Sequence, residues 1–304
     1  LWHRIGVGRP LGGMQRLADA LAARLAELGG AIVTGLAVEE VLCDRKGTRG
    51  VRLADGRVIE ARAVVATCDP RTAFHLVTPG AIERRWMARV DHAPANAAGA
   101  APLVVDLALS GRVRFGRHRR PDGLDLRLPT LLIGTADEIR ESFAASARGE
   151  PPAEPFLWAA VPSGCDPGQA PDGQDVVYLY PPAMPVAPRA GWDALRDDAV
   201  AATIRKAATC LEGLETLELG RWVATPDDLA RRLNVTNGCV THLDFGLLRS
   251  GPLRPAWGLG GRRPIVPGFF LGGAGTHPGG GVSGVPGKLA AMRAHEALAR
   301  EAAV

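Results

Sequence analysis

The chain has 304 residues, and its 36 Lys and Arg against 32 Asp and Glu leave a formal net charge of only +4. The cations are scattered and the chain holds only two tyrosines, which is too little basic and stacking surface for strand binding, so we expect no nucleic-acid partner. A hydrophobic content of 46% with 22% charged residues indicates a globular protein of one large or two modest domains and excludes disorder and collagen.

The cysteines and histidines argue against a disulfide framework and against a metal site. Five cysteines lie far apart, and the seven histidines show no ligand spacing with one another or with cysteine. No run approaches the roughly 18 apolar residues of a membrane-spanning helix, and the first twenty residues carry Gly, Pro and Arg where a signal peptide needs an apolar centre. We therefore expect a soluble, cytoplasmic protein without a bound metal.

The first predicted element is an amphipathic helix over residues 15–28, which the glycine pair at 29–30 ends. A short apolar run at 31–33 then predicts a buried strand. Alternation over 37–43, 50–53 and 58–59, with the turn Asp55-Gly56, predicts a hairpin. Residues 61–67 predict another buried strand.

From about residue 84 to 261 the pattern changes to isolated strands between Pro/Gly-rich loops. Strands that outnumber helices without strict alternation predict an antiparallel-rich α+β domain inserted here. After it, residues 267–271 predict a strand, and residues 288–300 predict the last helix. The strands predicted within the insertion cover 103–109, 130–133, 156–161, 176–179 and 217–223, and its helices cover 136–148 and 192–211.

A glycine-dense turn between the last strand and the last helix is the most informative block. Seven glycines stand at 272–284, and such a turn presents backbone N–H groups and a helix N-terminus to a phosphate or a flavin carbonyl oxygen. Ser283 is expected to cap the last helix, with its hydroxyl accepting an early N–H. His277 lies within the turn, and the pattern leaves open whether it faces a ligand or supports the backbone.

Other readings of the glycines fail on spacing. The patterns at 273–279 and at 6–12 are each one residue too long for a dinucleotide fingerprint and contain a proline. A phosphate-binding P-loop ending at Gly287-Lys288 has Leu289 where a Ser or Thr should hold magnesium. The sequence around Ser283 lacks the second spacer of a serine-hydrolase elbow, so nucleotide hydrolysis and serine hydrolysis are both disfavoured.

Several segments together resemble a known family. They are Pro10-Leu11-Gly12-Gly13-Met14, Gly29-Gly30-Ala31-Ile32, residues 50–56 (GVRLADG), residues 63–67 (AVVAT), Thr225-Pro226-Asp227-Asp228-Leu229 and residues 270–287 (FLGGAGTHPGGGVSGVPG). In this combination the chain resembles the FAD-dependent phytoene desaturase-like oxidoreductases, in the branch that includes the pyridine nucleotide-disulfide oxidoreductase domain 2 proteins. The resemblance covers essentially the whole chain, and the last segment is the most specific.

The resemblance implies a flavoprotein that moves a hydride from a lipophilic substrate to the flavin N5 and passes electrons to an acceptor such as a quinone or oxygen. It implies contacts of the turn with the flavin's ribityl and phosphate region and places the last helix's N-terminus near the pyrimidine ring. It leaves the catalytic side chains unassigned and peripheral membrane contact open. The residues implied to bind FAD are Val38, Thr67, Gly272, Gly273, Ala274, Gly275, Thr276, His277, Pro278, Gly279, Gly280, Gly281, Val282, Ser283 and Gly284.

One departure from the family concerns the cofactor. The family opens with a strand, a Gly-x-Gly-x-x-Gly turn and a helix that hold the FAD diphosphate, and nothing before Gly13 supplies them. We therefore expect the C-terminal portion of a longer enzyme or one half of a split one, with weak FAD binding, completed by a missing N-terminal segment or a partner chain. The expected fold is α/β: an incomplete Rossmann-like FAD-binding domain at 1–83 and 262–304, with an α+β substrate domain at 84–261.

Two alternatives stay open. A non-catalytic binding or scaffold protein would explain the missing fingerprint but not the intact glycine turn. A flavin amine oxidase-like enzyme acting on a polar substrate is disfavoured, because an aromatic cage for an amine needs Tyr and Trp, and Tyr178 and Tyr180 are the only tyrosines.

Overall fold

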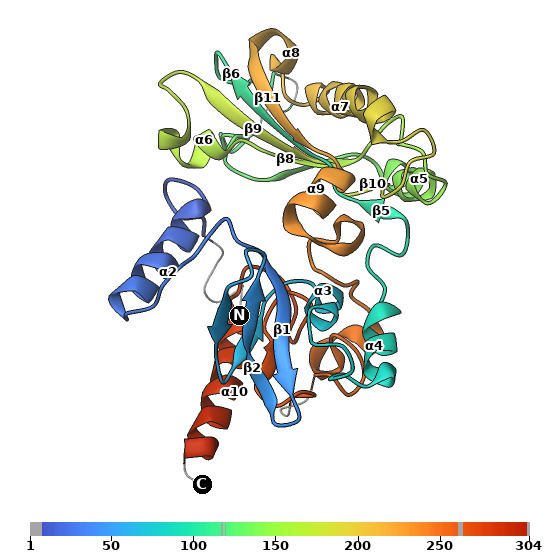
Figure 1. Ribbon diagram of the computed structural model, residues 1–304. Coiled ribbons are helices and arrows are strands. Elements are labelled where there is room, and N and C mark those ends of the chain that lie inside the picture. Colours follow the sequence, from blue (N-terminus) through green and yellow to red (C-terminus); the bar gives the residue numbers. More distant parts are fainter. Residues whose placement is uncertain (1–7, 117, 119, 261–263, 303–304) are drawn as a thin grey trace. The chain divides into compact units, whose positions relative to one another are not determined.

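The computed structural model describes residues 8–116, 118, 120–260 and 264–302, and the chain forms two compact units (Figure 1). Unit 1 comprises Leu1–Val33 and Ala98–Asp227, and unit 2 comprises Thr34–Ala97 and Asp228–Val304. These units depart from the expected domain boundaries at 1–33, 84–97 and 228–261. The first segment belongs to unit 1 because Gly12 N–H donates to the Asp166 carboxylate over 2.6 Å and Arg9 donates to the Thr130 hydroxyl.

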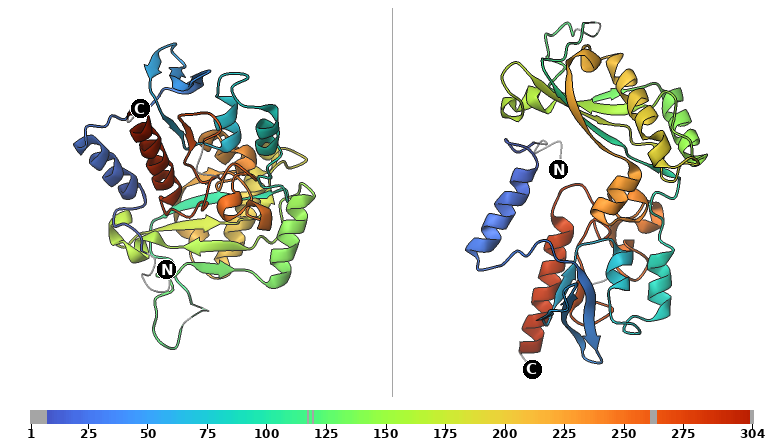
Figure 2. Two further views of the ribbon diagram at one scale, coloured as in Figure 1. Left: turned by 90° about the horizontal axis from the view of Figure 1, so that it is seen from below. Right: turned by 45° about the horizontal axis from the view of Figure 1, so that its top comes forward.

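Unit 1 is built on a five-stranded antiparallel sheet in the order β11-β6-β9-β8-β7, whose strands lie side by side (Figure 2). This confirms the five strands predicted for the insertion, each to within about one residue. The strands are β6 (Val104–Leu109), β7 (Leu131–Ile133), β8 (Leu157–Ala160), β9 (Asp175–Tyr180) and β11 (Glu218–Ala224).

Alternation along these strands sends one set of side chains into the core. Leu107 and Leu179 lie on the same face and pack against Ile204 of α7 (Trp192–Ala208), which covers that face of the sheet (Figure 1). The alternate positions, among them Asp106 and Tyr178, point away from α7. One face of the sheet is therefore buried under a helix and the other is not part of that core.

The remaining elements of unit 1 surround this sheet. The predicted helix at 136–148 is α5, which begins with a capping box in which the Thr135 hydroxyl and the Glu138 side chain each bond the other's backbone N–H. The elements are α5 (Ala136–Ala147), α6 (Pro162–Cys165), η1 (Pro167–Gln169), α8 (Leu214–Leu217) and the two-stranded pair β5 (Ala100–Ala101) and β10 (Met184–Pro185).

The first predicted helix is α2 (Gln15–Glu27), and its glycine stop has the expected geometry. Gly29 has φ +79°, its N–H donates to Ala26 O, and Gly30 N–H donates to Leu25 O, which is the Schellman arrangement. None of the residues of α2 is buried; Leu21, for example, is 66% exposed. The spacing predicted the helix correctly, but its apolar stripe packs against none of the described residues closely enough to be buried.

The buried strand predicted at 31–33 is wrong. These residues form no strand, and Ile32 and Val33 are 58% and 65% exposed. A three-residue apolar run has no period that distinguishes a strand from a connecting segment, and here it pairs with no other strand among the described residues.

Unit 2 contains an antiparallel meander and a parallel strand pair. The predicted hairpin is β2 (Gly47–Leu53) with β3 (Val58–Glu60), and β1 (Val38–Asp44) pairs with the other edge of β2. The strand predicted at 61–67 is shorter, β4 (Val64–Ala66), and it lies parallel to β12 (Phe269–Leu271). Val65 is 38% exposed, so β4 is only partly buried, whereas the sequence predicted a buried strand.

Helices complete unit 2 around a core that includes Val41, Phe74 and Phe269. The last helix packs against β12 and β4 and begins at residue 285, three residues before the predicted start, because Pro286 and Gly287 fit its first turn, where no intrahelical N–H bond is needed. The helices are α3 (Pro70–His75), α4 (Arg84–Asp91), α9 (Pro226–Leu233), which crosses the boundary between the units in sequence, η2 (Thr236–Gly238), η3 (Leu247–Arg249), η4 (Gly251–Leu253) and α10 (Val285–Ala302).

Two kinds of feature are absent from the described residues. None of the helices in that part of the chain has the length and apolar character needed to cross a bilayer. Nor do three or more His, Cys, Asp or Glu side chains come together there in a way that could hold a metal ion.

Candidate functional site

The glycine-dense turn joins β12 to α10 in unit 2, as the sequence predicts. Its first residue continues the parallel pairing, since Gly272 N–H donates to Ala66 O over 2.8 Å. Glycine is required here by close approach: a Cβ on Gly273 would lie 2.1 Å from Thr67 O, and one on Gly275 would lie 2.5 Å from the Pro70 ring. Thr67 therefore lies directly against the turn.

The first half of the turn is held by internal hydrogen bonds. Thr276 N–H and its hydroxyl both donate to Gly273 O, at 3.0 and 2.8 Å. Gly275 N–H donates to Nδ1 of His242 over 3.2 Å. Three of the N–H groups expected to meet the cofactor, those of Gly272, Gly275 and Thr276, are thus already paired within unit 2.

Arg254 is fully buried and holds the same half of the turn from the other side. Its Nε donates to Ala274 O over 3.1 Å, and its Nη2 donates to Thr241 O and Leu243 O over 2.6 and 2.8 Å. Burial lowers the pKa of this guanidinium below its ordinary value, but an arginine stays protonated at neutral pH. The side chain therefore fastens the segment around residue 243 to the turn with a buried cation.

Arg254 has further contacts on the same segment. Nη1 donates to Asp244 O over 3.1 Å and to Arg249 O over 3.4 Å, and the guanidinium carbon lies 4.5 Å from the centre of the Phe245 ring. The Asp244 carboxylate in turn accepts Asn96 N–H over 2.6 Å. The segment that supports the turn is thus itself bonded to the chain near residue 96.

His242 is held in the neutral form. Burial, with a smaller contribution from the Arg254 cation, lowers its pKa, while Asp69 acts in the opposite direction. Because Nδ1 accepts the Gly275 N–H, the neutral ring carries its proton on Nε2. Asp69 is also fully buried and accepts the N–H of Arg71 at the start of α3 and that of Thr236.

The second half of the turn is open. Residues 280–285 are exposed, and positive φ values follow closely at Gly279, Gly281, Val282 and Gly284. A Cβ on Gly281 or Gly284 would meet nothing within 4 Å. This exposed backbone leads directly into the N-terminus of the 18-residue helix α10, where N–H groups without intrahelical partners and the helix dipole favour an anion.

The individual sequence-predicted residues take different positions. The Ser283 hydroxyl accepts an early N–H of the helix, that of Val285, over 3.3 Å, but α10 begins at residue 285, so Ser283 stands one residue before the N-cap position expected for it. His277 has a buried Nδ1 without a hydrogen-bond partner among the described residues, and a cis peptide joins it to Pro278. Val38 begins β1 opposite Leu53, at the edge of the meander, and none of the described hydrogen bonds links it to the turn. Of the first glycine pattern, residues 6 and 7 lie outside the described residues.

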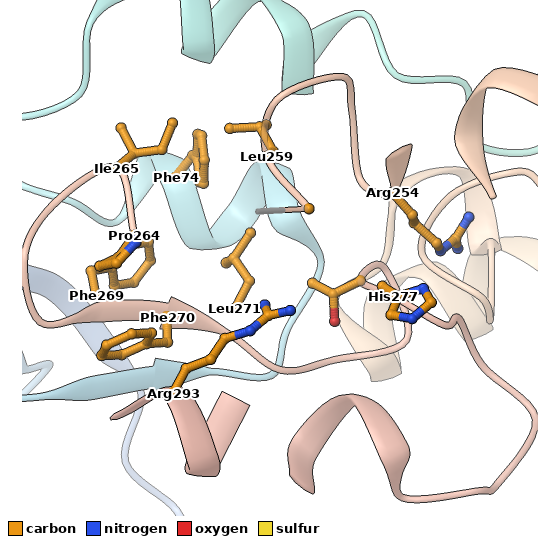
Figure 3. A pocket seen from close by; sticks show the side chains of 12 residues that line it. Phe74, Arg254, Leu259, Pro264, Ile265, Phe269, Phe270, Leu271, His277 and Arg293 are labelled. Atoms are coloured by element: carbon orange, nitrogen blue, oxygen red, sulfur yellow. The ribbon is translucent and has the colours of Figure 1, made fainter. Parts of the chain in front are cut away.

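A small cavity of about 50 Å³, lined by apolar side chains together with Arg254, His277 and Arg293, lies behind the turn (Figure 3). Figure 3 shows Arg254 and His277 together at one end, Phe269 and Phe270 with Pro264 at the other, and Arg293 reaching in from α10. The volume is far below the ~300 Å³ of a small-molecule site, so this cavity fits a few waters and not a flavin. Any cofactor contact must use the exposed side of the turn.

Sequence reasoning missed His242 and Arg254. Their partners in the turn lie 33 and 20 residues away along the chain, so neither helical nor strand periodicity reports them. The sequence around each residue gives one indication of its role. His242 stands in a segment rich in turn residues, and Arg254 precedes a proline close to the apolar strand β12.

Comparison with protein families gives a match over residues 3–291 to the family described as flavin containing amine oxidoreductase. Among curated relatives, the mouse pyridine nucleotide-disulfide oxidoreductase domain-containing protein 2 is 30% identical over 92% of this chain and 49% of its own length. The zeta-carotene-forming phytoene desaturase of Myxococcus xanthus is 28% identical over 95% of this chain and 52% of its own length. The chain thus spans about half the length of these relatives.

Solved structures show the same fold at low sequence identity. An oxidoreductase from Methanosarcina mazei superimposes with a TM-score of 0.62 at 18% identity, covering 97% of this chain and 57% of that protein. A triple mutant of putrescine oxidase, redesigned in its cofactor binding, gives a TM-score of 0.58 at 17% identity, covering 97% of this chain and 54% of that one. The mixed α/β fold is therefore part of a larger flavoprotein fold.

Proposed function

Because the chain belongs to the flavin containing amine oxidoreductase family, we propose that it is an FAD-dependent oxidoreductase that holds its cofactor at the exposed half of the glycine turn. FAD, when bound, supplies the acceptor for a hydride from a substrate carbon. The observation that carries the proposal is the open backbone at 280–285 leading into α10, supported from behind by buried side chains.

The residues of the chain fit such a group on physical grounds. Gly281 and Gly284 leave open space where a side chain would stand, so a ligand can approach the backbone closely. The N-terminus of α10 presents its positive end to electronegative groups of the cofactor. His242 and Arg254 restrict the first half of the turn, which keeps the donors of the second half in place without reorganisation on binding.

We propose further that this chain by itself holds FAD weakly, as the C-terminal part of a longer or two-chain enzyme. In dinucleotide-binding folds the diphosphate is bound by a strand, a Gly-x-Gly-x-x-Gly turn and a helix, and nothing before Gly13 supplies this unit. The backbone N–H groups of Gly272, Gly275 and Thr276 are bonded internally, so they add nothing to phosphate binding.

We propose that the substrate is lipophilic and that the electron acceptor is a quinone or oxygen. Peripheral contact with a membrane would give the protein access to such a substrate. Support comes from the relatives named as phytoene desaturases and from exposed apolar side chains of unit 1, such as Leu132 and Trp158.

We also propose a cytoplasmic location, since all five cysteines are free thiols. Purification without reductant followed by thiol titration in denaturant should give five thiols; fewer would contradict that location.

The test compares FAD affinity between variants of the turn. Gly281 has φ +119°, so Gly281→Ala strains the open half of the turn, and we expect FAD affinity to fall by about tenfold. Gly246→Ala is the matched control, because Gly246 in unit 2 has extended backbone and open space around a Cβ. Flavin fluorescence titrations of the three proteins give the affinities, and thermal unfolding verifies that both variants are folded. Equal affinity in all three would contradict a cofactor at this turn.

A further inference from the structure

The loop between β6 and β7 concentrates the positive charge of the chain. Most cations are scattered along the sequence, but residues 112–127 hold six arginines and two aspartates, a formal charge of +4 that equals the net charge of the whole chain. The rest of the sequence is therefore balanced, and the excess positive charge belongs to this loop. The six are Arg112, Arg114, Arg117, Arg119, Arg120 and Arg127, of which residues 117 and 119 lie outside the described part of the chain.

Both ends of this loop are fastened to one buried carboxylate. Asp175, the first residue of β9, accepts the backbone N–H of Val113 over 3.0 Å and lies 3.4 Å from Nη1 of Arg127. Arg114 is held as well, because its backbone N–H donates to Glu212 O over 3.2 Å and its carbonyl accepts Glu212 N–H over 2.7 Å. The base of the loop therefore has a fixed backbone.

Two arginines at this base point away from the core and are unpaired. Arg112 and Arg114 are exposed and flank Val113, which is only 3% exposed. Because the segment forms a β-bridge, alternate side chains point to the same side, and the two guanidinium groups leave the core together. Neither side chain forms an ion pair or a hydrogen bond with any other described residue.

A hollow of about 670 Å³ opens beside these arginines, within the range of small-molecule sites. Arg112, Arg114 and Arg120 line it together with His118, and Phe115 supplies an apolar side. A concave surface that carries charges mainly of one sign raises the local concentration of counter-ions. The hollow therefore favours an anion.

The carboxylates near the hollow leave Arg112 and Arg114 as its available cations. Asp122 is bound to Arg120 over 2.7 Å, and Asp125 is bound to Arg127 over 3.2 Å. Glu212 lines the hollow without an ion pair among the described residues, and its carboxylate lies where a Cβ on Gly116 would be 2.5 Å from Oε1. Glu212 is thus the one charge of the described lining that opposes an anion without being neutralised by a neighbour.

We propose that this hollow binds a phosphate-bearing anion, with Arg112 and Arg114 as its main ligands. A planar guanidinium group donates two parallel hydrogen bonds to phosphate oxygens. The fixed backbone at the base of the loop restricts both side chains, so less freedom is lost on binding. The phosphate belongs either to a soluble compound or to a lipid headgroup, and the experiment separates these sources. All of these residues lie in unit 1, and the binding needs neither flavin nor the glycine turn, so the proposal is independent of the proposed function.

Calorimetry on the purified, flavin-free chain tests the soluble source with inorganic pyrophosphate as the probe. Nitrate at equal ionic strength is the control for a general effect of anions. We expect saturable binding of pyrophosphate, at least about tenfold tighter than that of nitrate, and we expect it to weaken between about 50 and 200 mM salt because the arginines are exposed.

Cosedimentation with phosphatidylglycerol vesicles, against phosphatidylcholine vesicles as the uncharged control, tests the lipid source. Tight binding of pyrophosphate assigns a soluble ligand, and binding of phosphatidylglycerol vesicles without binding of pyrophosphate assigns a lipid headgroup. Binding of neither, or equal affinity for pyrophosphate and nitrate without binding of the anionic vesicles, would overturn the proposal.

Charge-neutralising variants locate the site. Arg112→Gln and Arg114→Gln each alter an exposed, unpaired side chain, so both should fold and should bind the phosphate probe about tenfold more weakly. Arg140→Gln removes the same charge from an exposed position on α5 and is the matched control, with no change expected. Glu212→Gln removes the opposing charge and should strengthen binding about threefold, a gain that damage to the structure would not produce. A folded Arg114→Gln protein that binds the probe as tightly as the wild type would refute the assignment.

Gly281→Ala separates this hollow from the glycine turn, because the N-terminus of α10 also favours an anion. A loss of pyrophosphate affinity in Gly281→Ala with none in Arg114→Gln would place the ion at the turn and overturn the proposal. The opposite pattern supports the hollow and leaves the test of FAD binding at the turn unaffected.

Discussion

Replacement of Arg254 by methionine should destabilise unit 2 severely. The guanidinium donates to five backbone carbonyls, those of Thr241, Leu243, Asp244, Arg249 and Ala274, at 2.6 to 3.4 Å, from a side chain with no solvent exposure. Each buried carbonyl that loses its donor costs about 1 kcal/mol or more, and the five contacts act as one unit. We therefore expect the free energy of unfolding to fall by about 3–5 kcal/mol.

Urea titrations followed by circular dichroism measure this loss. Arg140→Met is the matched control, since Arg140 is 73% exposed and, among the described residues, pairs with Asp137 alone on the same helix, so its loss should be below about 0.5 kcal/mol. Arg254→Lys should lie between, because a lysine keeps the charge but has a point-like ammonium group in place of the planar fork. An Arg254→Met protein within about 1 kcal/mol of the wild type would refute the argument that this cation holds the turn.

The other predictions concern the same turn and one helix of unit 1. Burial lowers the pKa of His242 below 6.5, and Asp69 and Arg254 are the charged groups that face the ring. The unfolded chain therefore binds the proton more tightly than the folded chain. The contribution of His242 to stability should be complete above about pH 6.5 and should fall as the pH decreases toward the lower pKa of the folded state. His242→Asn keeps an acceptor and tolerates the local φ of +66°, and urea titrations from pH 5 to 7.5 should show a shallower slope for it; an unchanged slope would exclude His242 as the source. Gly273→Ala places a Cβ 2.1 Å from Thr67 O and should cost about 3 kcal/mol, against a change below about 0.5 kcal/mol for Gly246→Ala, and equal thermal stability of the two would contradict the close approach. Thr135→Ala removes half of the capping box of α5 and should cost about 1 kcal/mol in urea unfolding; no loss would mean that the box does not stabilise the helix.

The fold of unit 1 was predictable because its elements carry local signals. Five strands appear as short apolar runs bounded by turn residues, and Thr135 with Glu138 marks the start of α5 in the sequence itself. Periodicity also predicted α2, but it reports only that one side of the helix is apolar. It does not report what covers that side, and Leu21 remains 66% exposed.

The candidate site was predictable only in its backbone. The glycines at 272–284 indicate a turn whose backbone lies close to other atoms, and they are visible in the sequence because they stand near one another along the chain. The side chains that hold this turn, His242 and Arg254, act through bonds that the topology forms between distant segments. The same holds for the loop at 112–127, whose arginines stand together in the sequence, whereas Asp175, the carboxylate that fastens both of its ends, comes from β9 and cannot be read from spacing.

Equilibrium dialysis of the purified chain against FAD, read by the flavin absorption bands, tests the central claim most directly. The account predicts one saturable site per chain with a dissociation constant of about 10 μM or weaker, so that desalting leaves a colourless protein. No excess of flavin on the protein side at any concentration would contradict cofactor binding at the turn. Stoichiometric flavin that survives desalting would contradict weak binding by this chain alone.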